Sequence, residues 1–203
     1  MTTIKHEGSG QIFKNPYLEK LTRTHISIPL TIYYGAGIVL LLYTIYLKAL
    51  PVWLAIVTFL VGVLAWTLYE YLFHRYVFHI DTSSEWRKNF QQKIHGIHHE
   101  YPRDKSRLAM PPLLSVVIAF IMIMFFKLIF SDQGLPFAGG FLAGYASYLL
   151  VHYSIHALKP PKNSFRYLWI NHSIHHYRDQ NVVFGVSSQL WDYVFGTMPK
   201  KKH

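Results

Sequence analysis

Residues 52–79, VWLAIVTFLVGVLAWTLYEYLFHRYVFH, decide how this chain folds. The part from 52 to 73 is almost entirely apolar, and about 20 apolar residues are enough for a helix to cross roughly 30 Å of hydrocarbon. The stretch then continues into His74 and His79, which stand five positions apart. The sequence therefore predicts a transmembrane helix that leaves the bilayer with histidines at its end.

Three further apolar stretches, at roughly 28–50, 112–130 and 135–156, resemble 52–73 in length and composition. Hydrophobic residues make up 51 % of the chain and charged residues 15 %, which is few for a soluble protein. The alternative, buried helices of a soluble protein, is disfavoured because only 203 residues are present to cover them. The sequence predicts an all-α membrane protein with four transmembrane helices.

The connections between these stretches are short, at Pro51 and at 131–134, which predicts two antiparallel hairpins. Only Lys48 and Lys127 lie near the hairpin tips; the other eighteen basic residues lie in the N-terminal segment, in 74–110 and in the C-terminal segment. The positive-inside rule places those three regions in the cytoplasm. We expect a cytoplasmic helical cap and cytoplasmic termini, with the bacterial inner membrane as the favoured location, or the endoplasmic reticulum membrane in a eukaryote.

The chain divides into three parts by composition. Residues 1–27 are polar, lack a signal peptide's apolar core and are expected to form a cytoplasmic arm on the membrane surface. Residues 28–197 are expected to form a single integral-membrane domain, and 198–203 a basic tail. The net charge of +10 suits a surface that meets anionic lipid, and no nucleic-acid-binding motif is present.

Ten of the thirteen histidines form a duplicated pattern. Each copy is a pair of histidines, a 16-residue gap and an H-x-x-H-H triplet. The ten are His74, His79, His95, His98, His99, His152, His156, His172, His175 and His176. Ten imidazoles are about what two metal ions need, so the pattern predicts a two-metal centre. His6, His25 and His203 belong to no cluster and are expected to be surface residues.

Helix geometry restricts how these histidines can point. A separation of four places His152 and His156 on one helix face. A separation of five turns roughly 140° on an ideal helix, so His74 and His79 need a bend, a local bulge, or metals on two sides. Positions i, i+3 and i+4 share a face, so each triplet is expected to present its three imidazoles together.

The ligand type limits the choice of metal. Imidazole suits zinc, iron, copper and nickel, while ten acidic residues are too few for a carboxylate-bridged di-iron bundle. The absence of cysteine excludes thiolate sites and iron–sulfur clusters. Two closed zinc sites of four histidines each are the structural alternative. A redox role is favoured over a structural one, because four apolar helices in a membrane do not need metal sites to stabilise them. Glu70 stands one turn before His74 and is expected to accept a hydrogen bond from it. Asp192, Glu100 and Asp104 are candidates for the same role elsewhere, with helix capping or surface exposure as the alternative for each.

Four stretches carry a resemblance to a known family. They are EYLFHRYVFH at 70–79, HGIHHEYPRDKSRLAMPP at 95–112, HYSIH at 152–156 and HSIHHYRDQNVVFGVSSQLWDYVFGT at 172–197. They resemble the fatty acid hydroxylase family of membrane di-iron oxygenases, and within it the fatty acid 2-hydroxylases. The likeness runs over nearly all of 60–197, and all ten metal-binding histidines of that family have a match here.

The resemblance implies two iron ions that activate O2, without haem, and hydroxylation at C2 of a long acyl chain. The substrate would be a free fatty acid or the N-acyl chain of a ceramide-like sphingolipid, and zinc can fill the same imidazoles in purified protein. Fungal and animal members carry a cytochrome b5 domain, for which the 27-residue arm leaves no room. An electron donor of cytochrome b5 or ferredoxin type is therefore expected in trans. Tyr148 matches a Tyr-Asp element of those relatives, with Leu149 in place of the aspartate.

An acyl chain in the cytoplasmic leaflet could slide between the helix ends and the cap, with its head group at the interface. Basic and aromatic residues expected near that head group are Tyr101, Arg103, Lys105, Arg107 and Trp191. Phosphate contacts at the membrane surface are the alternative for the basic ones. Three other functions stay open: a sterol or carotenoid hydroxylase or desaturase, a di-haem cytochrome, and a zinc transporter, although transporters place their ligands nearer the bilayer midplane.

Overall fold

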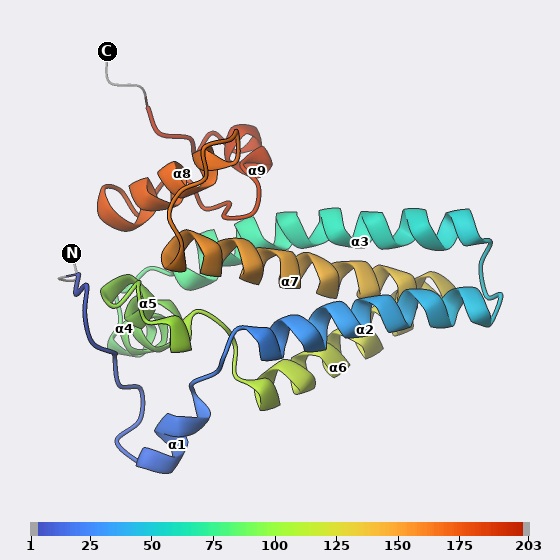
Figure 1. Ribbon diagram of the computed structural model, residues 1–203, viewed down its shortest axis with the longest axis horizontal. Helices are drawn as coiled ribbons and strands as arrows, with labels where there is room; N and C mark the ends of the chain where they lie inside the picture. The colour runs from blue at the N-terminus through green and yellow to red at the C-terminus, as the bar shows by residue number, and fades with distance from the viewer. Residues whose placement is uncertain (1–3, 201–203) are drawn as a thin grey trace.

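The computed structural model describes residues 4–200, and every regular element in that range is a helix, as the long apolar stretches predict. Four long helices lie side by side in an elongated bundle: α2 (Ser27–Tyr46), α3 (Val52–Phe73), α6 (Pro112–Phe130) and α7 (Gly134–Ala157). The shorter α-helices are α1 (Pro16–Leu21), α4 (Glu85–Gln91), α5 (Ile97–Glu100), α8 (Arg166–Tyr177) and α9 (Leu190–Val194). These gather at one end of the bundle, on the left in Figure 1.

Three helical runs are long and apolar enough to cross a membrane: Ser27–Tyr46, Val52–Phe78 and Lys105–Ala157. The third contains both α6 and α7, which are separated by the 3₁₀ turn η4 (Ser131–Gln133). Large apolar side chains such as Val39, Phe120 and Leu128 are exposed on these helices. So many exposed large apolar side chains on the long helices are unusual for a soluble monomer and normal for helices that meet lipid.

Proline and short turns set the limits of the long helices. Pro51 precedes α3, and Pro112 begins α6 at a position where its missing N–H costs no hydrogen bond. Residues 47–51 join α2 to α3, and η4 joins α6 to α7. Within each pair the two helices run in opposite directions and join at the end remote from the short helices (Figure 1).

Helix α7 is the centre of the bundle, because it packs against α2, α3 and α6. Glycines allow the close approach to α3. A methyl group added at Gly140 would overlap the carbonyl oxygen of Phe59, and one added at Gly62 would overlap that of Phe137. Small residues at such crossings let two backbones approach closely in membrane helices. The α3–α7 contact therefore fixes the two helices that lead into the paired histidines.

Replacing Gly140 by alanine is expected to destabilise the protein by about 1–3 kcal/mol, because the added carbon overlaps the α3 backbone. Gly35→Ala is the matched control, since a methyl group there meets nothing within 4 Å. Thermal unfolding of both variants in detergent measures the difference. Equal melting temperatures for the two variants would show that the α3–α7 approach is not tight.

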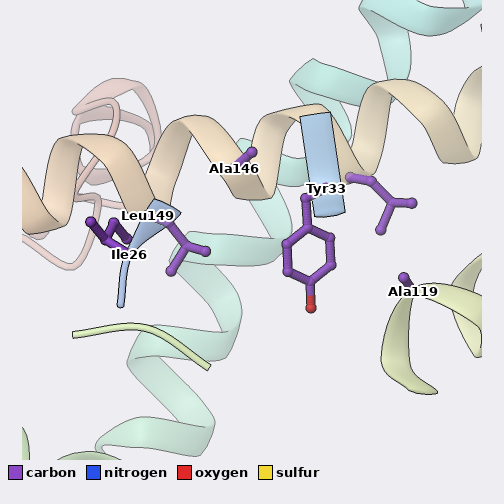
Figure 2. Packing of buried hydrophobic residues seen from close by; sticks show 6 residues of the cluster. Ile26, Tyr33, Ala119, Ala146 and Leu149 are labelled. Carbon is purple, nitrogen blue, oxygen red and sulfur yellow. The ribbon is translucent and has the colours of Figure 1, made fainter. Parts of the chain in front are cut away.

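A second set of contacts joins α2, α6 and α7 near the end that carries the short helices. Figure 2 shows the cluster, in which Ile26, Tyr33, Ala119, Leu142, Ala146 and Leu149 are buried. The Tyr33 hydroxyl donates to the Ser115 carbonyl oxygen over 3.2 Å, so its one polar atom is satisfied. This packing holds the last turns of α7, where His152 and His156 lie.

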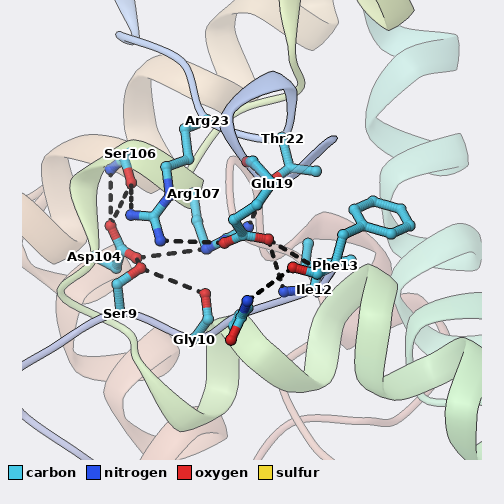
Figure 3. Close-up of polar contacts among 11 residues, drawn as sticks. Ser9, Gly10, Ile12, Phe13, Glu19, Thr22, Arg23, Asp104, Ser106 and Arg107 are labelled. Atoms are coloured by element: carbon cyan, nitrogen blue, oxygen red, sulfur yellow. Dashed lines mark hydrogen bonds and ion pairs between the residues drawn. The ribbon is translucent and has the colours of Figure 1, made fainter. Parts of the chain in front are cut away.

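The arm packs against residues 100–107, which follow the first triplet. Backbone hydrogen bonds join Lys5 to Glu100 over 2.8 Å and Thr24 to Ser106 over 3.0 Å. The guanidinium of Arg107 pairs with Glu19 and Asp104, and its side chain is only 5 % exposed (Figure 3). The described part of the arm is thus bound to the protein itself. Of the predicted basic tail, 201–203 lie outside the described residues.

Candidate metal centre

The ten clustered histidines form two groups of five. The first group is His74, His79, His95, His99 and His175; the second is His98, His152, His156, His172 and His176. In each group, one ring nitrogen of every histidine lies within 4.8 Å of the corresponding nitrogens of the others. Eight of the ten are buried, and His79 and His156 are half-buried.

A π-helical segment, η1 (His74–Phe78), brings the first pair together. The His79 N–H donates to the His74 carbonyl oxygen over 3.1 Å, which is the i→i+5 bond of a π-helix. The two ring centroids are 5.1 Å apart as a result. The local bulge, one of the three arrangements predicted for this pair, is therefore confirmed. A second π-helical segment, η2 (Gln92–Gly96), contains His95.

The expectation that each triplet presents its three histidines together is wrong. The outer two of each triplet join the pair of their own half, and the middle one crosses over: His98 joins the second group and His175 the first. Consecutive residues on an α-helix point about 100° apart, so His98 and His99 cannot easily face one ion. Each half of the duplicated pattern thus supplies four histidines to its own group and one to the other.

The two groups are neighbours. The rings of His99, in the first group, and His176, in the second, are stacked with centroids 4.1 Å apart. The rings of His98 and His99 are 5.9 Å apart. Ions held by the two groups would therefore be adjacent, separated by imidazole rings rather than by a layer of protein.

Hydrogen bonds show how the first group directs its nitrogens. Nδ1 of His74 lies 2.6 Å from the Phe184 carbonyl oxygen, and Nδ1 of His175 lies 2.9 Å from that of Val182. A carbonyl only accepts, so each Nδ1 carries the proton and each Nε2 presents its lone pair to the group. Facing Nε2 atoms in the two groups lie 2.8–3.2 Å apart.

These separations fit shared metal ions. Two nitrogens that each lie about 2.1 Å from one ion, at right angles, are about 3 Å apart. Converging lone pairs in a buried site repel one another unless a cation lies between them. The described residues therefore form two sets of ligands that could each hold a metal ion.

The second group is held differently. Nδ1 of His98, His172 and His176 is buried and has no hydrogen-bond partner among the described residues. In the first group, by contrast, the 182–184 backbone fixes two rings. Groups that hydrogen-bond to a metal ligand, and so fix its orientation, usually raise the affinity of the site for metal. The backbone therefore orients two rings of the first group and none of these three rings of the second.

Two buried carboxylates anchor the loop that supplies those carbonyls. Glu70 accepts from the Val186 and Ser187 N–H groups over 2.7 and 2.9 Å, and also from the Ser187 hydroxyl. Asp192 accepts from the Phe184 and Gly185 N–H groups, both over 2.8 Å. The acceptor role expected of Glu70 toward His74 is thus filled by a loop carbonyl, and Glu70 holds the loop.

Val183 has a backbone φ of 56°, which is a rare conformation for a β-branched residue. It stands between the two residues whose carbonyls reach His74 and His175. Local strain of this kind persists only where surrounding contacts hold it, and here the two carboxylates supply those contacts. The loop is therefore part of the histidine centre.

Of the remaining predicted site residues named here, Tyr148 contacts a histidine, and the others make contacts elsewhere. Tyr148 stacks on His152, with ring centroids 5.4 Å apart. Trp191 donates to the Thr67 hydroxyl over 3.0 Å, and the Tyr101 hydroxyl accepts from Lys5 over 2.9 Å. The guanidinium of Arg107, another residue expected near the head group, is buried in ion pairs with Glu19 and Asp104.

Loss of stability in acid is expected for chelator-treated protein. Burial, together with repulsion from neighbouring imidazoles, lowers the pKa of His99 to about 2; burial lowers the pKa of His175 to about 4. An unfolded histidine has a pKa of about 6.5. As the pH falls below 6.5, the unfolded chain takes up protons that the folded site excludes, so the free energy of unfolding decreases.

The free energy of unfolding should decrease by up to about 1.4 kcal/mol per pH unit for each histidine whose pKa is lowered in this way. Melting temperatures of the chelator-treated protein between pH 7.5 and pH 5 measure it. His25→Ala, which removes an exposed histidine outside the groups, should leave the slope unchanged. A melting temperature that does not change over this range would contradict the burial of neutral imidazoles.

Comparison with known proteins identifies the class to which this fold and centre belong. The model of the fatty acid hydroxylase family matches residues 59–197, which include all ten clustered histidines. The chain belongs to the fatty acid hydroxylase family.

Named relatives agree with this assignment. The chain is 40 % identical over 139 residues to dihydroceramide fatty acyl 2-hydroxylase FAH2 of Arabidopsis thaliana, covering 68 % of this chain and 59 % of the relative. It is 42 % identical to the fatty acid 2-hydroxylase of Rattus norvegicus, covering 69 % and 39 %. It is 36 % identical to the ceramide very long chain fatty acid hydroxylase scs7 of Schizosaccharomyces pombe, covering 94 % and 55 %. The chain therefore spans between about two fifths and three fifths of the length of these relatives.

A solved structure is also similar. The structure described as full-length scs7p, with only the hydroxylase domain visible, matches with a TM-score of 0.81 and 35 % identity. The match covers 96 % of this chain and 74 % of that chain. The helical arrangement described above is thus that of a known hydroxylase domain.

Proposed function

We propose that this protein is an O2-dependent hydroxylase that inserts one oxygen atom at C2 of a long acyl chain. The observation that carries the proposal is the pair of adjacent five-histidine groups in a chain of the fatty acid hydroxylase family. The names of the relatives, which are 2-hydroxylases of fatty acids or of fatty acyl chains in dihydroceramide, support the choice of C2.

The two groups are proposed to hold two iron ions, which supply the activation of O2 when they are bound. Each group has one histidine more than the four ligands of a closed structural zinc site. Zinc can still occupy the same imidazoles in purified protein. The proposal includes no haem: a haem needs axial ligands on opposite sides of a flat ring, whereas the five imidazoles of each group converge within 4.8 Å.

The proposed reaction is a monooxygenation. One C–H bond at C2 breaks and a C–O bond forms there with one atom of O2. The other oxygen atom leaves as water, with two protons and two electrons from outside the protein. The electrons come from a donor protein of cytochrome b5 or ferredoxin type.

The chain's own residues position and protect this reaction. The carbonyls of Val182 and Phe184 keep the protons of His175 and His74 on Nδ1, away from the ions. Burial of eight of the ten histidines limits the access of water, which would compete with the substrate. Tyr148, stacked on His152, is proposed to line the path of the acyl chain.

The membrane arrangement is part of the proposal. Helices α2, α3, α6 and α7 cross the bilayer as two hairpins within one domain, 28–197, and the short helices form a cytoplasmic cap. The distribution of Lys and Arg supports this orientation. The bacterial inner membrane is the favoured location, with the endoplasmic reticulum as the alternative.

Lipid mass spectrometry tests the activity. Cells that express the wild-type chain are compared with cells that express His98→Ala, and His25→Ala serves as the control with an exposed histidine replaced. We expect acyl chains with one added oxygen, located at C2 by fragmentation, in the wild-type and control cells only. Oxygenated sterols or carotenoids with unchanged acyl chains would favour the rival hydroxylase or desaturase function instead.

A further inference from the structure

Helix α1 carries its apolar side chains on the outside. Tyr17, Leu18 and Leu21 are between 48 % and 80 % exposed, and no residue of α1 is buried. Its one carboxylate faces inward instead, because Glu19 pairs with the buried guanidinium of Arg107. Polar contacts therefore hold α1 to the protein, and its apolar side chains face away from it.

Helix α9 has the same arrangement. Leu190, Tyr193 and Val194 are between 46 % and 67 % exposed. Its carboxylate, Asp192, is buried and accepts from two backbone N–H groups of the loop at 182–186, both over 2.8 Å. A surface helix of a soluble protein turns its apolar side chains toward the core and its charged ones toward water. Both α1 and α9 show the reverse.

Both helices lie beside the ends of long apolar helices. Only residues 22–26 separate α1 from α2. The Trp191 indole donates to the Thr67 hydroxyl over 3.0 Å, which places α9 against α3, one turn from the exposed Leu64. In Figure 1, α1 and α9 lie on opposite sides of the bundle and at the same end of it. A flat surface that crosses the bundle at this end would therefore meet both helices.

The charges around these helices favour a lipid surface as the occupant. Lys14 and Lys20 are exposed at α1 and have no ion-pair partner within residues 4–200. Glu19 and Asp192, the carboxylates of the two helices, face inward. Tyrosine, apolar side chains and neighbouring cations are typical of segments that lie in the headgroup region of a bilayer.

We propose that α1 and α9 are interfacial anchors, which hold the cap on the cytoplasmic leaflet from two sides. Their apolar faces enter the boundary between headgroups and acyl chains, and the two lysines contact lipid phosphates. Asp192 joins α9 to the loop that orients two rings of the first histidine group. Glu19 joins α1 to Arg107, in the segment that follows the first triplet. The contact with lipid is thus connected to the backbone around the histidines.

Spin labels test this inference. Because the chain has no cysteine, each single-cysteine variant carries a nitroxide at one site only. Leu18→Cys reports on α1 and Tyr193→Cys on α9. Val39→Cys, exposed on α2, is the lipid control, and Ser83→Cys, in the exposed segment before α4, is the water control. Zinc-loaded protein in vesicles of phosphatidylcholine and phosphatidylglycerol meets O2, which concentrates in the bilayer, or a neutral nickel chelate, which stays in water.

The ratio of the O2 collision rate to the nickel collision rate should be several times higher for the α1 and α9 labels than for Ser83→Cys. It should be lower than for Val39→Cys, because the anchors lie at the boundary of the bilayer. A ratio at either helix equal to that of Ser83→Cys overturns the inference. Shielding from both reagents also overturns it, since a protein, such as a second copy of the chain, would then cover the face.

The inference rests on the membrane arrangement in the proposed function, and the Val39→Cys label tests that arrangement separately. A label at this position that collides freely with the nickel chelate would contradict both. If Val39→Cys lies in lipid and the two anchor labels lie in water, only the inference fails. The measurement needs no turnover, so it does not depend on the hydroxylase activity.

Discussion

Replacing His175 by alanine is expected to remove the ion of the first histidine group and to leave that of the second in place. The reason is the crossing-over of the middle histidines, because Nε2 of His175 lies 2.9 Å from Nε2 of His79. After dialysis against a competing chelator, the metal content should fall from about two ions per chain to about one. His98→Ala should have the same effect on the second group.

Double variants distinguish this arrangement from one in which each triplet stays together. His175→Ala combined with His79→Ala affects one group only and should still leave about one ion per chain. His175→Ala combined with His152→Ala affects both groups and should leave none. Elemental analysis of purified protein gives the counts, with His25→Ala as the control. The reverse result for the two double variants would place His175 in the second group and contradict the assignment.

Removal of the Glu70 carboxylate is expected to destabilise the protein by about 3–5 kcal/mol and to weaken the first metal site more than the second. Glu70→Ala leaves the buried N–H of Val186 and that of Ser187 without an acceptor, and each unsatisfied group costs about 1–3 kcal/mol. The loop then no longer holds the carbonyls that orient His74 and His175. Thermal unfolding with and without added metal, together with metal counts, measures both effects.

Graded and control variants sharpen this experiment. Glu70→Gln keeps one acceptor oxygen and should lose less than Glu70→Ala, and Asp192→Asn should behave similarly because Asp192 holds the same loop. Glu85→Ala, which removes an exposed carboxylate, should change neither quantity. If Glu70→Ala retains both ions with unchanged affinity, the loop does not orient the ligands.

Much of the fold and of the histidine set could be predicted from the sequence, because both depend on local patterns. The residue types and the length of the apolar stretches indicate the long helices. The duplicated spacing of the histidines identifies the ten that form the two groups. The bulge at 74–78 was foreseeable because five residues overshoot one α-helical turn. These features need no knowledge of what lies across the bundle.

The features that were missed depend on residues distant in sequence. His98 and His175 each belong to the group of the other half, and this depends on which helices face each other in space. Helix geometry does offer one signal for it, because consecutive histidines such as His98 and His99 point in different directions. The acceptors at Val182 and Phe184 are backbone carbonyls, which every residue has. Arg107 pairs with Glu19, 88 positions away, and no local pattern indicates that contact.

The most direct test of the whole account is a crystal structure with anomalous diffraction data collected at the absorption edge of the bound metal. The account predicts two neighbouring peaks, one among His74, His79, His95, His99 and His175 and the other among His98, His152, His156, His172 and His176. A single peak, or two peaks whose ligands follow the order of the triplets in the sequence, would contradict it.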